Sequence, residues 1–312
     1  METVSGTDTV ESRPEPAVGG MAVETPPVGV KRRRSETLYF AFRNRKLVFG
    51  LSVVLFFLFL AIFGPMFTDA DPFEFGYPLG VPPSRDYWLG TTSAGQDVYA
   101  QFVYGLRSSF VVGAVAGCVA AVIGMAVGFT AGYRGGIVDD ILSMVTNVVL
   151  VIPTVAVLII VSAYLSVGSL LWEAVLIGVT SWPWAARAIR AQTFSLASRE
   201  FVSLARLSGQ RGWRIIVREI APNMSSYLFL TFILLFGGSI LIAATLDFLG
   251  LGPSQVMSLG LMMNVAVSNA ALQLGLWWWF VPPGVGITAI VAGLYIMNVG
   301  LDEVFNPKLR KT

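Results

Sequence analysis

The sequence predicts an all-α polytopic membrane protein with six transmembrane helices. Hydrophobic residues make up 55% of the 312 residues and charged residues only 13%, whereas a soluble domain carries about 25% charged residues. The mean hydropathy is +0.71 and the chain holds 32 glycines, a residue that lets transmembrane helices approach closely. A transmembrane helix needs about 20 mostly apolar residues. The segments that meet this requirement are residues 47–67, 109–132, 137–165, 170–186, 225–249 and 277–301.

The distribution of lysine and arginine predicts that both termini are cytoplasmic. All of the 21 basic residues except Arg85 and Arg107 lie in the terminal segments or in the connections after the second and fourth predicted spans. Basic residues concentrate on the cytoplasmic side of membrane proteins. The connections 68–108 and 250–276 are then external, and the second of them could hold a short re-entrant or interfacial helix. Three consecutive tryptophans follow it, and we expect them to join an aromatic belt at the membrane surface: Trp277, Trp278 and Trp279.

The N-terminal region divides into two parts before the six-span region at residues 47–312. Residues 1–30 are polar and rich in Pro, Thr, Ser and Glu, so they bury too little apolar surface to order and are predicted to be a disordered tail. Residues 31–46 mix basic and aromatic side chains. This composition predicts an interfacial helix in contact with membrane lipid.

Several chemistries are excluded by what the sequence lacks. It contains no histidine, which removes histidine metal sites and Ser-His-Asp triads. None of its four lysines follows a glycine, so it has no P-loop and is not predicted to hydrolyse ATP. The single cysteine, Cys118, is assigned to packing, and the net charge of +2 is too small to say anything by itself about nucleic acid. No nucleic-acid partner is expected. We expect no cofactor and no metal in this chain.

Ionisable residues inside the predicted spans are nearly absent. Glu173 lies near the start of the fourth span and Asp247 near the end of the fifth. Proton-coupled and sodium-coupled transporters use such residues for their ion pathways. Their scarcity therefore argues against ion coupling within the chain.

A basic loop at residues 199–223 is the most informative segment. It predicts a helix ending near Ser208, a turn at Gly209, and a second helix over residues 212–220 that is stopped by Pro222. Glycine permits a sharp turn and proline ends a helix. This hairpin is interpreted as a docking element for a soluble partner. The alternative interpretation is a basic loop that only sets topology and contacts anionic lipid.

The loop resembles the cytoplasmic coupling loop of binding-protein-dependent ABC transporter permeases. Their Glu-Ala-Ala motif is represented here by Ser203, Leu204 and Ala205, so the glutamate is replaced, whereas Gly209 and Pro222 match. The resemblance covers about residues 43–310 and is closest to the C subunits of dipeptide and oligopeptide permeases. The segments that carry it are residues 87–109 (YWLGTTSAGQDVYAQFVYGLRSS), 132–140 (GYRGGIVDD), 246–252 (LDFLGLG), 277–284 (WWWFVPPG) and 306–310 (NPKLR).

This resemblance implies an ABC importer type I permease fold and a multi-pass protein of the cell membrane. It implies four partners: a second permease subunit, two ABC ATPase subunits that bind ATP and Mg²⁺, and an extracytoplasmic solute-binding protein. Residues expected to couple to the ATPases are Ser203, Leu204, Ala205, Arg206, Gly209, Arg211, Arg214, Arg218 and Pro222. The solute would be a peptide, with nickel or an oligosaccharide as alternatives. Rivals from other classes are an ion-coupled secondary transporter and a membrane scaffold without transport.

Some polar residues near the span ends are interpreted structurally. Asp97 is expected to cap a helix or form a solvated ion pair with Arg107, rather than to act in a gate. Asp139 and Asp140 are expected to cap the third span, where the helix dipole favours negative charge. Prolines inside the spans predict kinks or moving parts of a gate, between which the sequence does not decide: Pro153, Pro183, Pro282 and Pro283.

Overall fold

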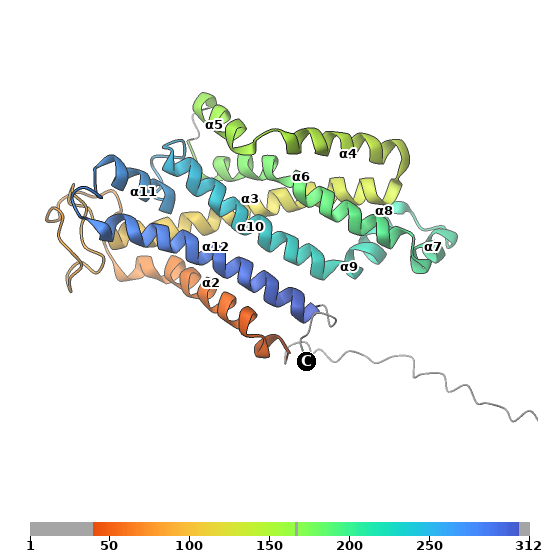
Figure 1. Ribbon diagram of the computed structural model, residues 1–312, viewed down its shortest axis with the longest axis horizontal. Helices are drawn as coiled ribbons and strands as arrows, with labels where there is room; N and C mark the ends of the chain where they lie inside the picture. The colour runs from red at the N-terminus through yellow and green to blue at the C-terminus, as the bar shows by residue number, and fades with distance from the viewer. Residues whose placement is uncertain (1–39, 166–167, 306–312) are drawn as a thin grey trace, which may run out of the picture.

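The computed structural model describes residues 40–165 and 168–305 as an elongated bundle of helices (Figure 1). Within these residues the only β-pairing is an isolated bridge between Thr91 and Asp97. The tail predicted at residues 1–30, most of the predicted interfacial helix and the 306–310 motif lie outside the described residues.

Four helices are long and apolar enough to cross a membrane. They are α2 (Arg45–Phe63) with its 3₁₀ extension η1 (Gly64–Phe67), α3 (Val98–Arg134), α10 (Ser225–Phe248) and α12 (Trp277–Phe305). They correspond to the first, second, fifth and sixth predicted spans. Helix α3 begins earlier than predicted because the Asp97 carboxylate accepts a hydrogen bond from the Ala100 backbone N–H at 2.9 Å. Asp97 is therefore a helix cap, as the sequence indicated.

The third predicted span is broken at Pro153, where the sequence predicted a kink or a moving part. It consists of α4 (Gly136–Val151) and α5 (Thr154–Leu165), which are bent by 76° relative to each other. Pro153 supplies no backbone N–H, and the residue before a proline is driven into extended conformation. Ile152 has φ −74° and ψ 124° accordingly. If this bent pair is one span, five segments qualify by length and composition.

Helix α6 (Leu170–Ala197) covers the fourth predicted span and continues beyond it. It is not among the helices that are apolar enough to qualify as spans. It packs along α3 through three glycines spaced one turn apart on α3. A Cβ added at Gly124 would lie 3.0 Å from the Ala185 methyl. At Gly128 it would lie 2.7 Å from the Ala186 carbonyl oxygen, and at Gly132 it would lie 2.6 Å from the Arg190 carbonyl oxygen. The two backbones therefore approach closely, as in other small-residue helix contacts.

One end of the bundle is formed by residues 68–97 and by α11 (Leu259–Ser268), the short helix expected in the connection before the sixth span (Figure 1). Of the three tryptophans expected to join an aromatic belt, only Trp277 is exposed. Trp278 is buried and donates to the Thr91 carbonyl at 3.1 Å. Trp279 is buried and donates to Gln101 Oε1 at 3.1 Å. The two buried indoles attach the start of α12 to the 68–97 segment and to α3.

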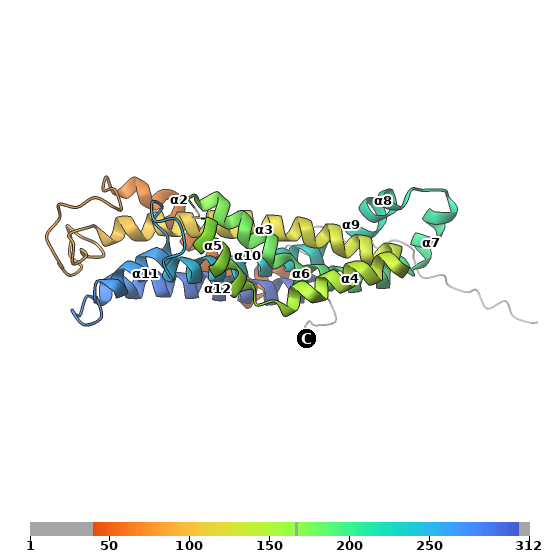
Figure 2. The same ribbon diagram turned by 90° about the horizontal axis from the view of Figure 1, so that it is seen from above.

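The opposite end carries α7 (Glu200–Leu207) and α8 (Gly212–Ile215), which project beyond the other helices (Figure 2). They are followed by a π-helical turn, η2 (Ile216–Ile220), and by α9 (Ala221–Asn223). The expectation that Pro222 stops the second arm is wrong, because helical structure continues through it. The widened π turn bonds the Ala221 N–H to the Ile216 carbonyl, and this accommodates the proline that a regular α-helix would exclude.

Candidate functional site

The hairpin of residues 199–223 is built into the core of the bundle. Its four fully or largely buried apolar residues pack in one cluster with Phe129 of α3 and Ile189 of α6. These hairpin residues are Val202, Ala205, Ile215 and Ile220. A buried apolar face of this kind holds a short helical element that would not be stable alone. The hairpin is therefore in direct packing contact with α3 and α6.

The turn predicted at Gly209 is present and has a defined hydrogen-bond pattern. Gly209 has φ +73°, and its N–H donates to the Arg206 carbonyl at 3.0 Å. The Gln210 N–H donates to the Ala205 carbonyl at 3.2 Å. This pair of bonds is a Schellman motif, which places a left-handed residue directly after a helix. A glycine meets that requirement without strain.

Eight of the nine residues expected to couple to the ATPases are exposed, and one is not. Ala205 is buried and belongs to the hairpin's own packing, so it supports the surface rather than forming it. The exposed residues are Ser203, Leu204, Arg206, Gly209, Arg211, Arg214, Arg218 and Pro222.

Tyr133 at the end of α3 holds the two arms of the hairpin together. The Arg206 guanidinium lies 4.9 Å from the centre of its ring, a distance typical of cation–π contacts. On the other arm, a Cβ at Gly212 would lie 2.9 Å from the Tyr133 ring. The second arm can therefore approach Tyr133 only through a glycine at this position.

Sequence reasoning named Leu204 but missed the other exposed apolar residues of this surface. Leu207 is 85% exposed and Trp213 is 61% exposed, and Leu204 and Val217 are also exposed. Leu204 and Leu207 are one turn apart on α7, opposite the buried Val202 and Ala205. A short helix with apolar residues on two opposite faces can bury only one of them, so this pattern in α7 could have predicted the exposed apolar surface. Exposed apolar residues rimmed by charge mark protein interaction sites.

The hairpin arginines around these exposed apolar residues form no salt bridge with described residues. In the part of the chain that the structure describes, the salt bridges are Lys46–Glu303 and Arg190–Asp139. Neither uses an arginine of the hairpin. Arg206 and Arg214 instead lie against aromatic rings, Tyr133 and Trp213. The surface therefore offers an apolar centre and a positively charged rim.

The Asp139–Arg190 ion pair joins α4 to α6. The Arg190 Nη2 donates to Asp139 Oδ2 at 2.6 Å, and its Nε donates to Oδ1. Asp139 is therefore not the helix cap that the sequence suggested, and Gly135 occupies the cap position without a side-chain bond. Arg187, one turn before Arg190, donates to Asn147 Oδ1 at 2.6 Å. These contacts attach α4 to the same helix that carries the hairpin.

The two acidic residues noted in the predicted spans are both buried. Glu173 is 2% exposed and Asp247 is 5% exposed. Asp247 accepts a hydrogen bond from the Ser258 hydroxyl at 2.5 Å, and Ser258 caps α11. Asp247 thus joins the end of α10 to the start of α11.

Comparisons with known proteins agree with this architecture. Residues 124–311 match the family described as "Binding-protein-dependent transport system inner membrane component". The chain belongs to this family, whose members are the membrane permease components, not the ATPases, of ABC importers. It is a membrane protein with several apolar helices.

Individual relatives match along most of the chain. The dipeptide transport system permease protein DppC of Alkalihalophilus pseudofirmus is 32% identical, over 86% of this chain and 88% of the relative. The oligopeptide transport system permease protein OppC of Bacillus subtilis is 31% identical over the same shares. A putative peptide permease protein of Brucella suis is 31% identical, over 85% of this chain and 88% of the relative.

Proposed function

We propose that this chain is the permease subunit of an ATP-driven peptide importer and forms the solute path together with a second permease. The names of its relatives, which are dipeptide and oligopeptide permeases, support the substrate class. A nickel or oligosaccharide importer of the same family is the second candidate. An ion-coupled secondary transporter is disfavoured by membership of a binding-protein-dependent family.

The proposed topology has six spans with cytoplasmic termini. The bent pair α4–α5 serves as the third span and the less apolar α6 as the fourth. The basic residues concentrate at the termini and in the hairpin, which supports a cytoplasmic location for both. Residues 68–97 and α11 lie at the opposite end of the bundle (Figure 1) and would face the binding protein.

The hairpin is the proposed contact with the ATPase subunits. The observation that carries this role is its two-sided construction: an exposed face of leucine, tryptophan and arginine, and a buried face packed on α3 and α6. Closure of the ATPases around ATP would favour one arrangement of the hairpin, and the spans packed on it would follow. A partner shifts such an equilibrium by its differential affinity for the two states. In this proposal the chain needs no cofactor, since ATP and Mg²⁺ are bound by the partners.

Affinity purification of the tagged chain from native membranes in mild detergent tests this proposal. We expect two P-loop ATPases, a second permease and a solute-binding protein to co-purify, with a peptide bound to the binding protein. An oligosaccharide or nickel ion on that protein would replace the substrate assignment. Purification without any ATPase, from cells that express the neighbouring subunits, would contradict the importer assignment.

A further inference from the structure

Two buried carboxyl groups meet at the end of the bundle that carries α11. Glu173 lies in the first turn of α6 and Asp247 in the last turn of α10. They are 2% and 5% exposed, and their carboxyl groups lie within hydrogen-bonding reach of each other. Two carboxylates this close in an enclosed space repel each other strongly if both are ionised.

The elements packed around this pair supply no positive charge to it. Helices α5 and α11 and residues 249–258 contain no charged residue, and α12 contains none before Asp302. Helix α3 contains none between Arg107 and Arg134, and Arg107 lines a pocket on the side of α3 that faces α2. The titratable side chain of α5, Tyr164, is 85% exposed. The two carboxyl groups therefore have only each other as ionisable neighbours in this part of the bundle.

The two carboxyl groups differ in the hydrogen bonds that they receive. Asp247 Oδ2 accepts a hydrogen bond from the Ser258 hydroxyl at 2.5 Å. Neither oxygen of Glu173 receives a hydrogen bond from a described residue. A buried carboxylate without a donor is strongly unfavourable, whereas a protonated carboxyl group carries an O–H that can donate. Asp247 is the acceptor within its reach.

The backbone that follows α10 closes over Asp247. A Cβ added at Gly252 would overlap with Asp247 Oδ1, and a Cβ at Gly260 would lie 2.7 Å from Asp247 Cβ. Both Glu173 oxygens are likewise closed to solvent. These contacts enclose both carboxyl groups, and of the ligands that could join them a proton is the one that needs no space. The hydrogen-bond donor that Glu173 lacks therefore has to come from the pair itself.

We propose that Glu173 and Asp247 form a proton-binding site, in which protonated Glu173 donates a hydrogen bond to ionised Asp247. Asp247 also accepts the bond from Ser258, which caps α11. One proton thus completes a chain of hydrogen bonds that fastens α6 to α10 and to α11. When the proton is withdrawn, the two carboxylates repel each other and the attachment of α11 to α6 is weakened. The inference does not depend on which solute the chain transports.

Infrared difference spectroscopy detects this proton directly. The full chain is purified with its partner subunits in a maltoside detergent, which has no carbonyl group, near neutral pH, where exposed carboxyl groups are ionised. We expect a C=O band of a protonated carboxyl group that is lost in Glu173→Gln and retained in Asp302→Asn, a control at an exposed carboxylate. A wild-type spectrum without the band would mean that both groups are ionised and would overturn the proposal, even if the variant does not assemble. A band that persists in Glu173→Gln would overturn it as well.

The pH dependence of stability tests the energetic role of the proton. The folded chain keeps a proton that the unfolded chain releases, so this site makes the wild type less stable as the pH rises. Since one proton is involved, the unfolding equilibrium constant should rise by up to about tenfold per pH unit relative to that of Glu173→Gln. The glutamine amide donates to Asp247 at every pH and removes the dependence. Denaturant unfolding of both forms in detergent at several pH values measures this, and equal slopes would contradict the proposal.

Hydrogen exchange of backbone amides tests whether the proton fastens α11. At a pH high enough to remove the infrared band, the amides of α11 should exchange faster in the wild type than in Glu173→Gln at the same pH. The amides of α2, which is remote from the pair, serve as the internal control and should exchange equally in both. Equal exchange of α11 in the two forms would refute the fastening role. All three measurements use the purified complex without solute, so their outcome is separate from that of the proposed peptide import.

Discussion

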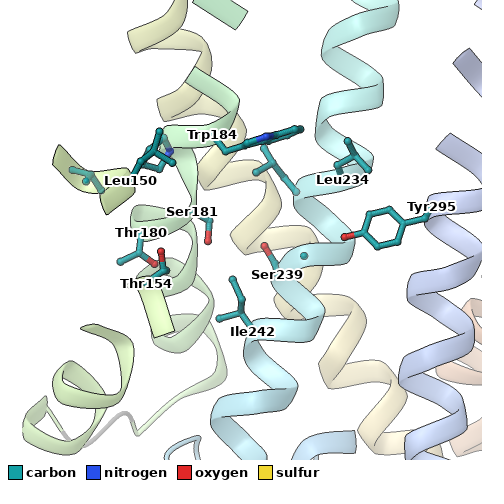
Figure 3. A pocket seen from close by; sticks show the side chains of 13 residues that line it. Leu150, Thr154, Thr180, Ser181, Trp184, Leu234, Ser239, Ile242 and Tyr295 are labelled. Atoms are coloured by element: carbon teal, nitrogen blue, oxygen red, sulfur yellow. The ribbon is translucent and has the colours of Figure 1, made fainter. Parts of the chain in front are cut away.

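Helix α6 has two unlike sides. Toward α3 it packs backbone to backbone against the glycines at 124, 128 and 132, with no room for a methyl group. Toward α10 it faces a cavity of about 420 Å³, whose lining includes Ser181, Gly238 and Tyr295 (Figure 3). A Cβ added at Gly238 meets no atom within 4 Å. Close-packed contacts transmit displacement, whereas a cavity can change its shape. From this difference we expect that α3, α6 and the hairpin move as one unit, and that their movement changes the width of the cavity.

Replacing Gly209 by proline should have the largest effect on transport. Proline fixes φ near −65° and has no N–H, whereas Gly209 has φ +73° and donates to the Arg206 carbonyl. We expect uptake to fall to the level seen without ATP while the chain still inserts. Uptake assays at matched membrane levels measure this. Gly209→Asn is the control, since asparagine tolerates this backbone conformation. Normal ATP-driven uptake by Gly209→Pro would remove the coupling role assigned to the turn.

The two sides of α6 can be compared with one kind of substitution. Gly128→Ala places a methyl 2.7 Å from the Ala186 carbonyl and should destabilise the protein by about 1–3 kcal/mol. Gly238→Ala fills open space in a helix and should stabilise it by roughly 0.5–1 kcal/mol. Denaturant unfolding in detergent micelles measures both. Equal effects of the two substitutions would mean that the packing contrast is not real.

The apolar centre of the hairpin surface should contribute to ATPase binding. Leu207→Glu removes a side chain that is 85% exposed and adds a charge, and we expect it to weaken binding by about 2 kcal/mol. Titration of the purified ATPase against the permease pair in nanodiscs gives the affinity. Ser203→Glu adds the same charge on the same helix, where related permeases have glutamate, and should leave binding unchanged or strengthen it. A Leu207→Glu variant that binds normally would restrict the contact to the arginines.

The smallest expected effect concerns the contact between Arg206 and Tyr133. A guanidinium 4.9 Å from the ring centre at an exposed site contributes about 0.5–1 kcal/mol. A double-mutant cycle of Arg206→Leu and Tyr133→Leu isolates that interaction from the other roles of each residue. Additive changes in unfolding free energy would show that the two side chains do not interact.

The hairpin could be predicted because its signals are local. Gly209 fixes a turn through its own backbone freedom, and the arginines mark the segment in one short stretch of sequence. Its continuation through Pro222 could not be predicted, since it depends on a π turn at Ile216–Ile220. Likewise, Pro153 indicated a kink, but a proline alone does not distinguish a kink from the 76° bend between α4 and α5.

The cavity could not be predicted because its residues are far apart in the chain. Thr154, Ser181, Ser239 and Tyr295 come from four different parts of the bundle, and none stands out in its own segment. The same is true of Asp139 and Arg190. From the sequence, Asp139 was interpreted as a helix cap and Arg190 as a basic residue that sets topology, but the packing of α4 on α6 brings the two together as an ion pair.

The central claim is that the hairpin controls the width of the cavity through α6. It is tested most directly by the distance across the cavity in the assembled transporter, with spin labels at Val148 of α4 and Leu241 of α10, both exposed. In a Cys118→Ala background, we expect ATP to shift the distance distribution in the otherwise wild-type complex and to leave it unchanged when Gly209 is replaced by proline. A distribution that ATP does not change, or a shift that persists in the Gly209→Pro variant, would contradict the claim.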